Sequence, residues 1–247
     1  MPDPLAGKVA LITGGSRGIG AAIARRLAAD GAAVAFTYAA SPVKAQEVVR
    51  AIESAGGKAF AIQADAADAG STRAAVINTV EKFGALDILV NSAGIVTVTP
   101  IDQFAVEDFE RMIAINIKGM FAAVQEAVRH MRDGGRIILI GSCNSEHVPF
   151  PGGSVYALTK AAVAGFTKGL ARDLGPRSIT VNNVQPGPTD TDMNPAHGPG
   201  APGTVQHVAL GRYARPAEIA AFVAYLAGPE AAFITGASLL IDGGYSA

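Results

Sequence analysis

Two kinds of hydrophobic pattern alternate along the chain. Short runs such as Val9-Ala10-Leu11-Ile12 are continuously apolar, which is typical of strands covered on both faces in a parallel sheet. Longer stretches carry apolar residues three and four positions apart, the spacing of an amphipathic helix. The first pattern predicts strands at Lys8–Thr13, Ala33–Tyr38, Lys58–Gln63, Leu86–Asn91, Arg136–Ser142, Thr180–Val184 and Ser238–Ile241. The second predicts helices at Ala21–Ala29, Val43–Ser54, Thr72–Phe83, Val106–Met131, Val155–Leu174 and Ala217–Ala227.

Strict alternation of strands and helices defines the expected fold class. It predicts an α/β protein with a Rossmann-like, doubly wound parallel sheet of about seven strands and helices on both faces. Neither a repeat nor a charge block marks a linker, so we expect a single domain over residues 1–247. One segment departs from the pattern, because prolines and glycines crowd residues 186–211. Residues 187–211 are interpreted as a substrate-binding loop, with an unstructured excursion as the alternative.

Composition narrows the function classes. Of the 247 residues, 49% are hydrophobic and 17% are charged, far from the signature of disorder. A net charge of −1 provides no basic field for nucleic acid, and no apolar stretch reaches the roughly 20 residues of a membrane helix. The single cysteine, Cys143, cannot form an internal disulfide, and the N-terminus lacks a signal-peptide pattern. We therefore expect a cytoplasmic protein.

The first predicted strand ends in a glycine-rich turn that opens onto a helix. Residues 13–20 read Thr-Gly-Gly-Ser-Arg-Gly-Ile-Gly, with glycines at 14, 15, 18 and 20. At such a turn, free N–H groups and the helix dipole favour an anion, and missing Cβ atoms let a pyrophosphate approach the backbone. A glycine cluster alone would fit an ordinary tight turn equally well. Its place at the first strand-to-helix junction favours a dinucleotide site.

The end of the second predicted strand indicates which dinucleotide. Many NAD sites carry an acidic residue there, which would repel a 2′-phosphate. This strand ends Tyr38-Ala39-Ala40-Ser41 without an acid, and Arg17 lies in the glycine turn. We therefore expect NADP(H) in preference to NAD(H), with Arg17 and Ser41 meeting the phosphate. Lys44 is a further candidate, the alternative being a solvated helix face.

Tyr156 and Lys160 stand four residues apart on a predicted helix and so project from one face. A nearby ammonium favours phenolate, so Lys160 is expected to lower the pKa of Tyr156 and fit it for acid–base work near neutrality. Ser142 ends the fifth predicted strand, at the edge where ligands of open α/β sheets bind. The neighbouring Cys143 is interpreted as buried packing and not as a nucleophile. Asn116 is a candidate for a buried amide that holds a catalytic water.

Taken together, these motifs resemble the short-chain dehydrogenase/reductase family over essentially the whole chain. The matching pieces are the glycine turn, Asp65, Asn91-Ser92-Ala93-Gly94, Asn116, Ser142, the Tyr156/Lys160 pair, Pro186-Gly187 and Ile241-Asp242-Gly243-Gly244. Two positions depart from the family pattern. Ser92 stands where asparagine is common, and Gln185 where an apolar residue is usual; Gln185 serves either a local hydrogen bond or pocket polarity.

The resemblance implies an NADP(H)-dependent oxidoreductase that transfers a hydride between the nicotinamide and a ketone or secondary alcohol carbon. Tyr156 would be the general acid/base, Ser142 would hydrogen-bond the carbonyl, Lys160 would hold the ribose, and Asn116 would hold a water. The cofactor-binding set it implies is Gly14, Ser16, Arg17, Gly18, Ile19, Gly20, Tyr38, Ser41, Asp65, Ala66, Asn91, Ala93, Gly94, Tyr156, Lys160, Pro186, Gly187, Thr189 and Thr191. It also implies a homotetramer.

The substrate is expected to be a neutral carbonyl compound of the carbonyl or 3-oxoacyl type. The expected pocket residues are Val96, Asn144, His147, Val148 and Met193, although His147 also fits an exposed loop histidine. The four histidines lack metal-ligand spacing, so no metal is expected. A regulatory protein of the same fold that binds a cyclic dinucleotide is the alternative, because residues 184–196 are also similar to such a protein.

Overall fold

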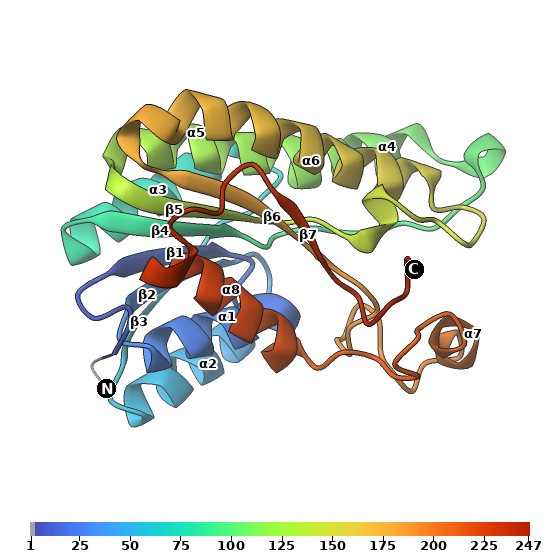
Figure 1. The fold of residues 1–247 in the computed structure, drawn as a ribbon, viewed down its shortest axis with the longest axis horizontal. Helices are drawn as coiled ribbons and strands as arrows, with labels where there is room; N and C mark the ends of the chain where they lie inside the picture. The colour runs from blue at the N-terminus through green and yellow to red at the C-terminus, as the bar shows by residue number, and fades with distance from the viewer. Residues whose placement is uncertain (1–2) are drawn as a thin grey trace.

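The computed structural model describes residues 3–247, and within them seven strands form one sheet in the order β3-β2-β1-β4-β5-β6-β7 (Figure 1). Every neighbouring pair is parallel. The strands are β1 (Val9–Thr13), β2 (Ala33–Tyr38), β3 (Lys58–Gln63), β4 (Leu86–Asn91), β5 (Met131–Ile140), β6 (Thr180–Pro186) and β7 (Ser238–Ile241). The predicted doubly wound fold is confirmed.

Helices cover both faces of the sheet, as Figure 1 shows. One layer consists of α1 (Gly18–Ala29), α2 (Pro42–Ser54) and α8 (Pro216–Ala227). The opposite layer consists of α3 (Ala69–Phe83), α5 (Met120–His130) and α6 (Ser154–Leu174). In β1, Ile12 packs toward the first layer and Leu11 toward the second. Both faces are therefore buried, which explains the continuously apolar strands.

One predicted helix is interrupted. The expected helix Val106–Met131 is α4 (Val106–Ile113), a π-helical turn (Ala114–Gly119) and α5. At Gly119 this helical segment lies very close to the chain that follows β3. A Cβ on Gly119 would lie 2.1 Å from the carbonyl oxygen of Ala66. The turn contains Asn116, and such π turns often occur at functional sites.

The fifth strand also differs from its prediction, since it begins at Met131 and ends at Ile140. Gly141 still pairs with β6 through its N–H to the Val184 carbonyl (2.7 Å). The chain then leaves the sheet in a short helical turn, Cys143–Ser145, so that Ser142 is its N-cap and not a strand residue.

The carboxyl ends of the strands meet at the edge of the sheet where the order reverses, between β1 and β4. Crevices at this switch point are the usual ligand sites of open α/β sheets. The 187–211 loop leaves β6 at this edge and carries the short helix α7 (Ala201–Val205). It is ordered: Thr189 bridges to Ala214, and the Ala214 N–H donates to the Pro188 carbonyl (2.9 Å). Figure 1 shows α7 beside the C-terminus.

Candidate active site

The glycine turn between β1 and α1 is packed backbone against backbone. The N–H groups of Gly14 and Gly15 donate to the side-chain and main-chain oxygens of Thr37, at 2.9 and 2.8 Å. A Cβ on Gly20 would lie 2.2 Å from the Gly14 carbonyl oxygen, and one on Gly14 would lie 2.9 Å from the Cα of Ala93. Gly14 also has a φ of 71°, which disfavours a side chain. These contacts set the shape of the turn.

The first turn of α1 is open to an anion. Arg17 is its N-cap residue, but among the described residues no side chain caps the helix, and its first turn holds no acid. The first N–H groups of a helix have no partner within it, and the helix dipole makes this end positive. With exposed Arg17 beside it, the turn has the donors and the charge that suit a dinucleotide pyrophosphate.

The other candidate nucleotide residues lie along the same edge of the sheet. Asn91 is buried at the end of β4, where the N–H groups of Ser92 and Ala93 donate to Thr13 Oγ1 (both 3.1 Å). Tyr38 ends β2, and exposed Asp65 follows β3, where its carboxylate accepts the Ala67 N–H. The candidates set along this edge are Ser16, Gly18, Ile19, Ser41, Ala66, Gly94, Pro186, Gly187, Thr189 and Thr191.

Lys44 has a partner that the sequence did not indicate. Its Nζ lies 2.5 Å from a carboxylate oxygen of Asp192, and both side chains are about half exposed. The hydrogen bond and charge of Lys44 lower the pKa of Asp192, and Arg17 adds to the effect. Lys44 therefore ties α2 to the 187–211 loop across the candidate nucleotide crevice.

Tyr156 and Lys160 lie on one face of α6, next to Ser142. The Lys160 Nζ is 5.6 Å from the centroid of the Tyr156 ring and donates to the Ile140 carbonyl (2.9 Å). Lys160 and Ser142 are buried, and Tyr156 is partly buried. The structure thus brings a phenol, a hydroxyl and an amine together at the carboxyl end of β5.

The pKa of Tyr156 differs from the expectation. Burial raises it to about 12, and a hydrogen bond with Ser142 acts in the opposite direction. Burial also lowers the pKa of Lys160 to about 8. The expected lowering of the Tyr156 pKa by Lys160 is therefore wrong for this structure, because loss of hydration dominates and the ammonium is directed at the Ile140 carbonyl.

The side chain of Asn116 hydrogen-bonds both the segment after β4 and helix α6. Its Nδ2 donates to the Ile95 carbonyl (2.9 Å) and to Thr159 Oγ1 (3.2 Å), and its Oδ1 accepts the Ile95 N–H (2.9 Å). Both amide hydrogens are used, so its side chain has no donor left for a water. Thr159 is a site residue that the sequence analysis missed; it is 0% exposed, and a hydroxyl three residues after Tyr156 on the helix was the available signal.

The turn after β5 orients the Ser142 hydroxyl. Ser142 Oγ accepts the Asn144 N–H (3.1 Å), and Asn144 Nδ2 donates to the His147 carbonyl (3.0 Å). Cys143 is buried, and burial, followed by the charge of Asp242, raises its pKa to about 11. A thiol held in this form is a poor nucleophile, which fits the interpretation of Cys143 as packing.

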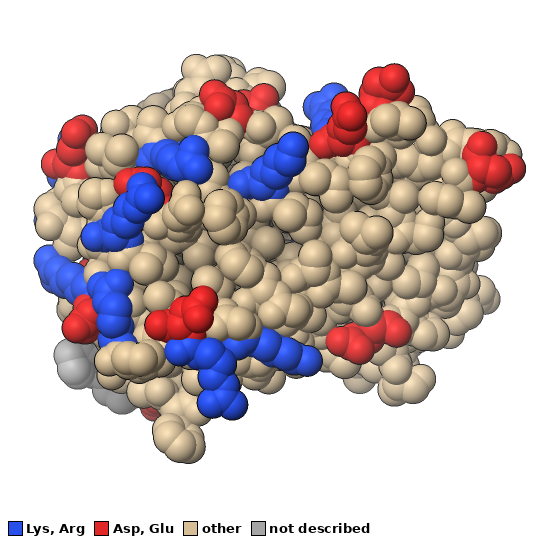
Figure 2. Space-filling model, turned by 90° about the horizontal axis from the view of Figure 1, so that it is seen from above, with Lys and Arg blue, Asp and Glu red and all other residues tan. Residues whose placement is uncertain are grey.

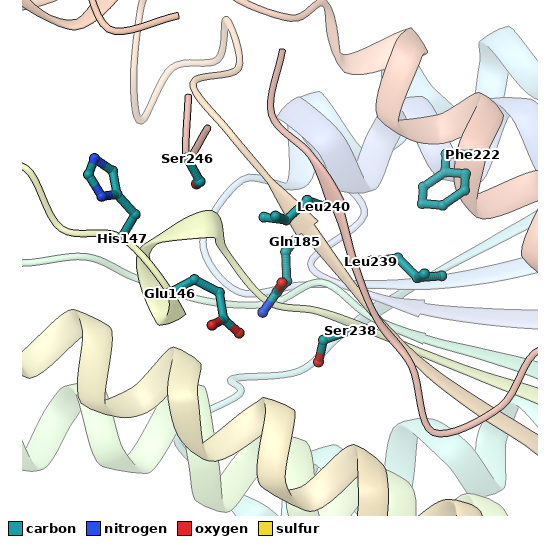
Figure 3. Close-up of a pocket in the computed structure, with 8 residues that line it drawn as sticks. All are labelled: Glu146, His147, Gln185, Phe222, Ser238, Leu239, Leu240 and Ser246. Atoms are coloured by element: carbon teal, nitrogen blue, oxygen red, sulfur yellow. The ribbon is translucent and has the colours of Figure 1, made fainter. Parts of the chain in front are cut away.

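A cavity of about 470 Å³ lies beside β7 (Figure 3), and no residue of the glycine turn lines it. Its walls are Glu146, His147, Gln185, Phe222, Ser238, Leu239, Leu240 and Ser246. Gln185 lines it and also donates to Ser145 Oγ, so the local hydrogen bond expected of that residue is present. Of the five expected pocket residues, only His147 lines this cavity; it is exposed. Val96, Asn144, Val148 and Met193 do not line it.

Charge is distributed unevenly over the face that Figure 2 shows. Lys and Arg side chains gather, with Asp and Glu among them, on the half away from the carboxyl ends of the strands. The other half is mostly uncharged. Within residues 3–247, no helix is long and apolar enough to cross a bilayer, and no group of three or more His, Cys, Asp or Glu could hold a metal.

The doubly wound sheet and the open glycine turn define a class, the dinucleotide-binding α/β proteins. The family model for enoyl-(acyl carrier protein) reductase matches residues 14–246. The chain therefore belongs to the short-chain dehydrogenase/reductase family.

Three relatives illustrate the likeness. A short-chain dehydrogenase/reductase from Serratia marcescens is 61% identical with a TM-score of 0.98, over 99% of this chain and 100% of that one. A short-chain dehydrogenase from Burkholderia cenocepacia, solved in complex with NADP, is 52% identical with a TM-score of 0.97 over the same shares. The cyclic-di-GMP-binding biofilm dispersal mediator protein of Escherichia coli K12 is 49% identical over 98% of each chain.

Proposed function

We propose that the protein is an NADP(H)-dependent reductase that interconverts a ketone and a secondary alcohol. The observation that carries this proposal is the grouping of Tyr156, Ser142 and Lys160 at the carboxyl end of β5. The open first turn of α1 lies at the same edge of the sheet, one strand beyond β4. The proposed proton donor and the proposed nucleotide site therefore lie at the same edge of the sheet.

NADP(H) fits the residues at the ends of β1 and β2. Exposed Ala39 and Ala40 follow β2 where an acid would repel a 2′-phosphate, and Arg17 is exposed nearby. The NADP bound by the relative from Burkholderia cenocepacia supports the same choice. Besides Arg17 and Ser41, the phosphate would meet Lys44, provided that Lys44 leaves Asp192. Thr189, Thr191 and the 91–94 turn would complete the nucleotide site.

The preference for NADP(H) is tested by introducing an acidic residue just after β2, where this chain has none. Ala39→Asp should weaken NADPH binding about 10- to 100-fold, because hydrogen bonds to charged groups contribute roughly 1.5–3 kcal/mol. NADH binding should change far less. Ala55→Asp, exposed at the far end of α2, is the matched control. The dissociation constants of NADPH and NADH, measured by nucleotide fluorescence, provide the test. If Ala39→Asp weakened the binding of both nucleotides equally, the preference for NADP(H) would be refuted.

Reduction of the carbonyl uses the protonated phenol. With a pKa of about 12, Tyr156 carries its proton at every physiological pH and can donate it to the carbonyl oxygen. Ser142 Oγ hydrogen-bonds the same oxygen and orients it. When bound, NADPH supplies the hydride to the carbonyl carbon. Lys160, beside the Tyr156 ring and hydrogen-bonded to the Ile140 carbonyl, would hold the nicotinamide ribose, and the proton that Tyr156 gives up would be replaced from solvent. Asn116 and Thr159 hold α6 against the 91–95 segment.

The substrate class is a neutral carbonyl compound, of carbonyl-reductase or 3-oxoacyl type. Val96, Val148 and Met193 provide apolar surface, and Asn144 and His147 provide polar groups for the pocket. NADPH oxidation over a panel of cyclic, aryl and β-keto carbonyl compounds tests this. We expect turnover with several uncharged ketones. A panel without any NADPH-consuming compound would contradict the proposal.

A second candidate function is cyclic-dinucleotide binding, favoured by the 49% identity to the Escherichia coli dispersal mediator. Such a regulator needs no turnover. Calorimetric titration with cyclic-di-GMP, alongside the ketone panel, separates the two. Micromolar binding without NADPH oxidation would favour the regulator over the reductase.

A homotetramer in the cytoplasm completes the proposal. Exposed apolar side chains on α4, α5 and α6 support one interface: Val106, Phe109, Phe121 and Leu158. Tyr225, Phe233 and Leu240 support a second, near the C-terminus. Light scattering should give about four times the 25.1 kDa chain mass; a monomer mass would contradict it. The single buried thiol fits a reducing compartment.

A further inference from the structure

Tyr245, in the C-terminal tail, is inserted between two histidines. Its ring meets His147 edge-to-face, with centroids 5.9 Å apart and an interplanar angle of 80°. It meets His207 in the same manner, at 6.4 Å and 87°. His147 belongs to the turn that carries Ser142, and His207 belongs to the 187–211 loop. One side chain, only 6% exposed, therefore joins three segments that are distant in sequence.

A small buried cluster lies under this contact. Tyr245 packs with Cys143 and Val208, separately from the two main cores. Cys143 follows Ser142 directly, and Val208 follows His207. Both the aromatic pairs and the apolar packing therefore connect the loop to the turn after β5 through Tyr245.

The tail is held in a defined shape. The Asp242 carboxylate accepts the N–H groups of Gly244 (3.0 Å) and Ser246 (2.9 Å), which closes the turn around Tyr245. Gly243 and Gly244 have φ values of 64° and 79°, a conformation that favours glycine. The Gly243 carbonyl also accepts the Leu210 N–H (3.0 Å), so the loop and the tail share a backbone hydrogen bond.

Two hydrogen bonds connect His147, one of the partners of Tyr245, to the Ser142 hydroxyl. The carbonyl of His147 accepts Asn144 Nδ2, and the N–H of Asn144 donates to Ser142 Oγ. A shift of His147 would therefore move Asn144 and change the direction of the Ser142 hydroxyl. In Figure 3, His147 and Ser246, the neighbour of Tyr245, stand on the same side of the cavity beside β7.

We propose that Tyr245 is a positioning residue that fixes the 187–211 loop against the Ser142 turn and so sets how tightly the substrate is held. The loop part of this inference stands on the contacts alone. The substrate part rests on the proposed reductase function. Tyr245 itself acts through its contacts with His147 and His207.

Hydrogen exchange measured by mass spectrometry tests the loop part without any substrate. Tyr245→Leu should speed exchange of the 208–211 amides about tenfold, because two aromatic pairs are lost. Tyr245→Phe keeps the ring and should stay within about twofold of the wild type. Phe83→Leu, which removes the edge-to-face pair of Phe83 in α3 with Phe60 in β3, is the matched control. Wild-type exchange in Tyr245→Leu, or equal acceleration of the 208–211 amides by Phe83→Leu, would overturn the proposal.

A second variant guards against misfolding. His207 is exposed, so His207→Ala should fold normally, yet it removes one of the two pairs. His207→Ala should speed exchange of the 208–211 amides about threefold. Unchanged exchange of these amides would contradict the proposed role of Tyr245, even if Tyr245→Leu failed to fold.

Kinetics test the substrate part, with the ketone of the panel that has the highest kcat/KM. Tyr245→Leu should raise KM about tenfold and lower kcat less than about threefold, while NADPH affinity stays unchanged. Tyr245→Phe should restore the wild-type KM. An unchanged KM in Tyr245→Leu would refute the substrate part. If the wild type reduces no ketone, the reductase proposal fails, and the exchange data still decide the loop part.

Discussion

The two sides of the crevice are held by different kinds of contact. On the nucleotide side, backbone packs against backbone: Gly20 against Gly14, and Gly14 against Ala93. On the other side, which we propose binds the substrate, side chains hold the 187–211 loop through Tyr245, and the Lys44–Asp192 pair joins this loop to α2. The first arrangement leaves no room for a Cβ at Gly14 or Gly20, whereas the second depends on which side chains meet.

We expect the largest effect from a change at Tyr156, which should lower turnover without weakening nucleotide binding. Tyr156→Phe removes the proton donor and keeps the ring, so kcat should fall about 10²- to 10⁴-fold. The NADPH dissociation constant should change less than about threefold, because the glycine turn is untouched. Steady-state turnover and nucleotide fluorescence measure the two quantities. Turnover within about tenfold of the wild type would remove Tyr156 from the mechanism.

The next effect concerns the buried amine. The pKa of Lys160 is lowered from 10.5 to about 8, so between these pH values the unfolded chain holds a proton that the native protein does not. Its contribution to the free energy of unfolding should rise with pH through this window, by about 3 kcal/mol. Below pH 8 both states are protonated and the contribution is constant.

Denaturant unfolding of the wild type and Lys160→Met from pH 7 to 10 measures this contribution by difference. The variant should lose the rise, and Lys168→Met, exposed on the same helix, should keep it. A parallel pH dependence in all three proteins would show that Lys160 titrates normally.

Backbone packing on the nucleotide side predicts a smaller but sharp effect. Gly20→Ala places a Cβ 2.2 Å from the Gly14 carbonyl oxygen, so it should lower the free energy of unfolding by about 1–3 kcal/mol and weaken NADPH binding. Gly165→Ala is the control, because its Cβ would meet nothing within 4 Å; in a helix it should stabilise by about 0.5–1 kcal/mol. Equal stability of the two variants would contradict the close-packing account.

The smallest effect lies at the ion pair that joins the two sides. Asp192→Asn should change stability by less than about 1 kcal/mol, because the pair is half exposed. It should nevertheless tighten NADPH binding a few-fold, since Lys44 and Arg17 would be free for the 2′-phosphate. NADH affinity should not change. Unaltered NADPH affinity would show that Asp192 does not compete for these cations.

Much of the nucleotide side could be predicted from sequence, and less of the substrate side. The glycine turn is readable because only glycine fits its contacts, and its place after the first strand fixes its role. The Tyr156/Lys160 pair follows from helical spacing, but the raised pKa of Tyr156 depends on burial that spacing does not reveal. The predicted helix Val106–Met131 contains a π-helical turn at Ala114–Gly119, next to the close approach of Gly119 to Ala66, and hydrophobic spacing reveals neither feature. Tyr245 contacts His147 and His207 only in the folded protein. No local sequence pattern predicts these contacts.

A crystal structure of the protein with NADP⁺ bound would show whether the nucleotide and the proton donor meet at one place. We expect the nicotinamide C4 within about 4 Å of a position that both Tyr156 Oη and Ser142 Oγ can reach by hydrogen bonds, the proximity that hydride and proton transfer require. We also expect the pyrophosphate at the first turn of α1. A nicotinamide ring remote from both hydroxyl groups, with the pyrophosphate elsewhere, would contradict the proposed function.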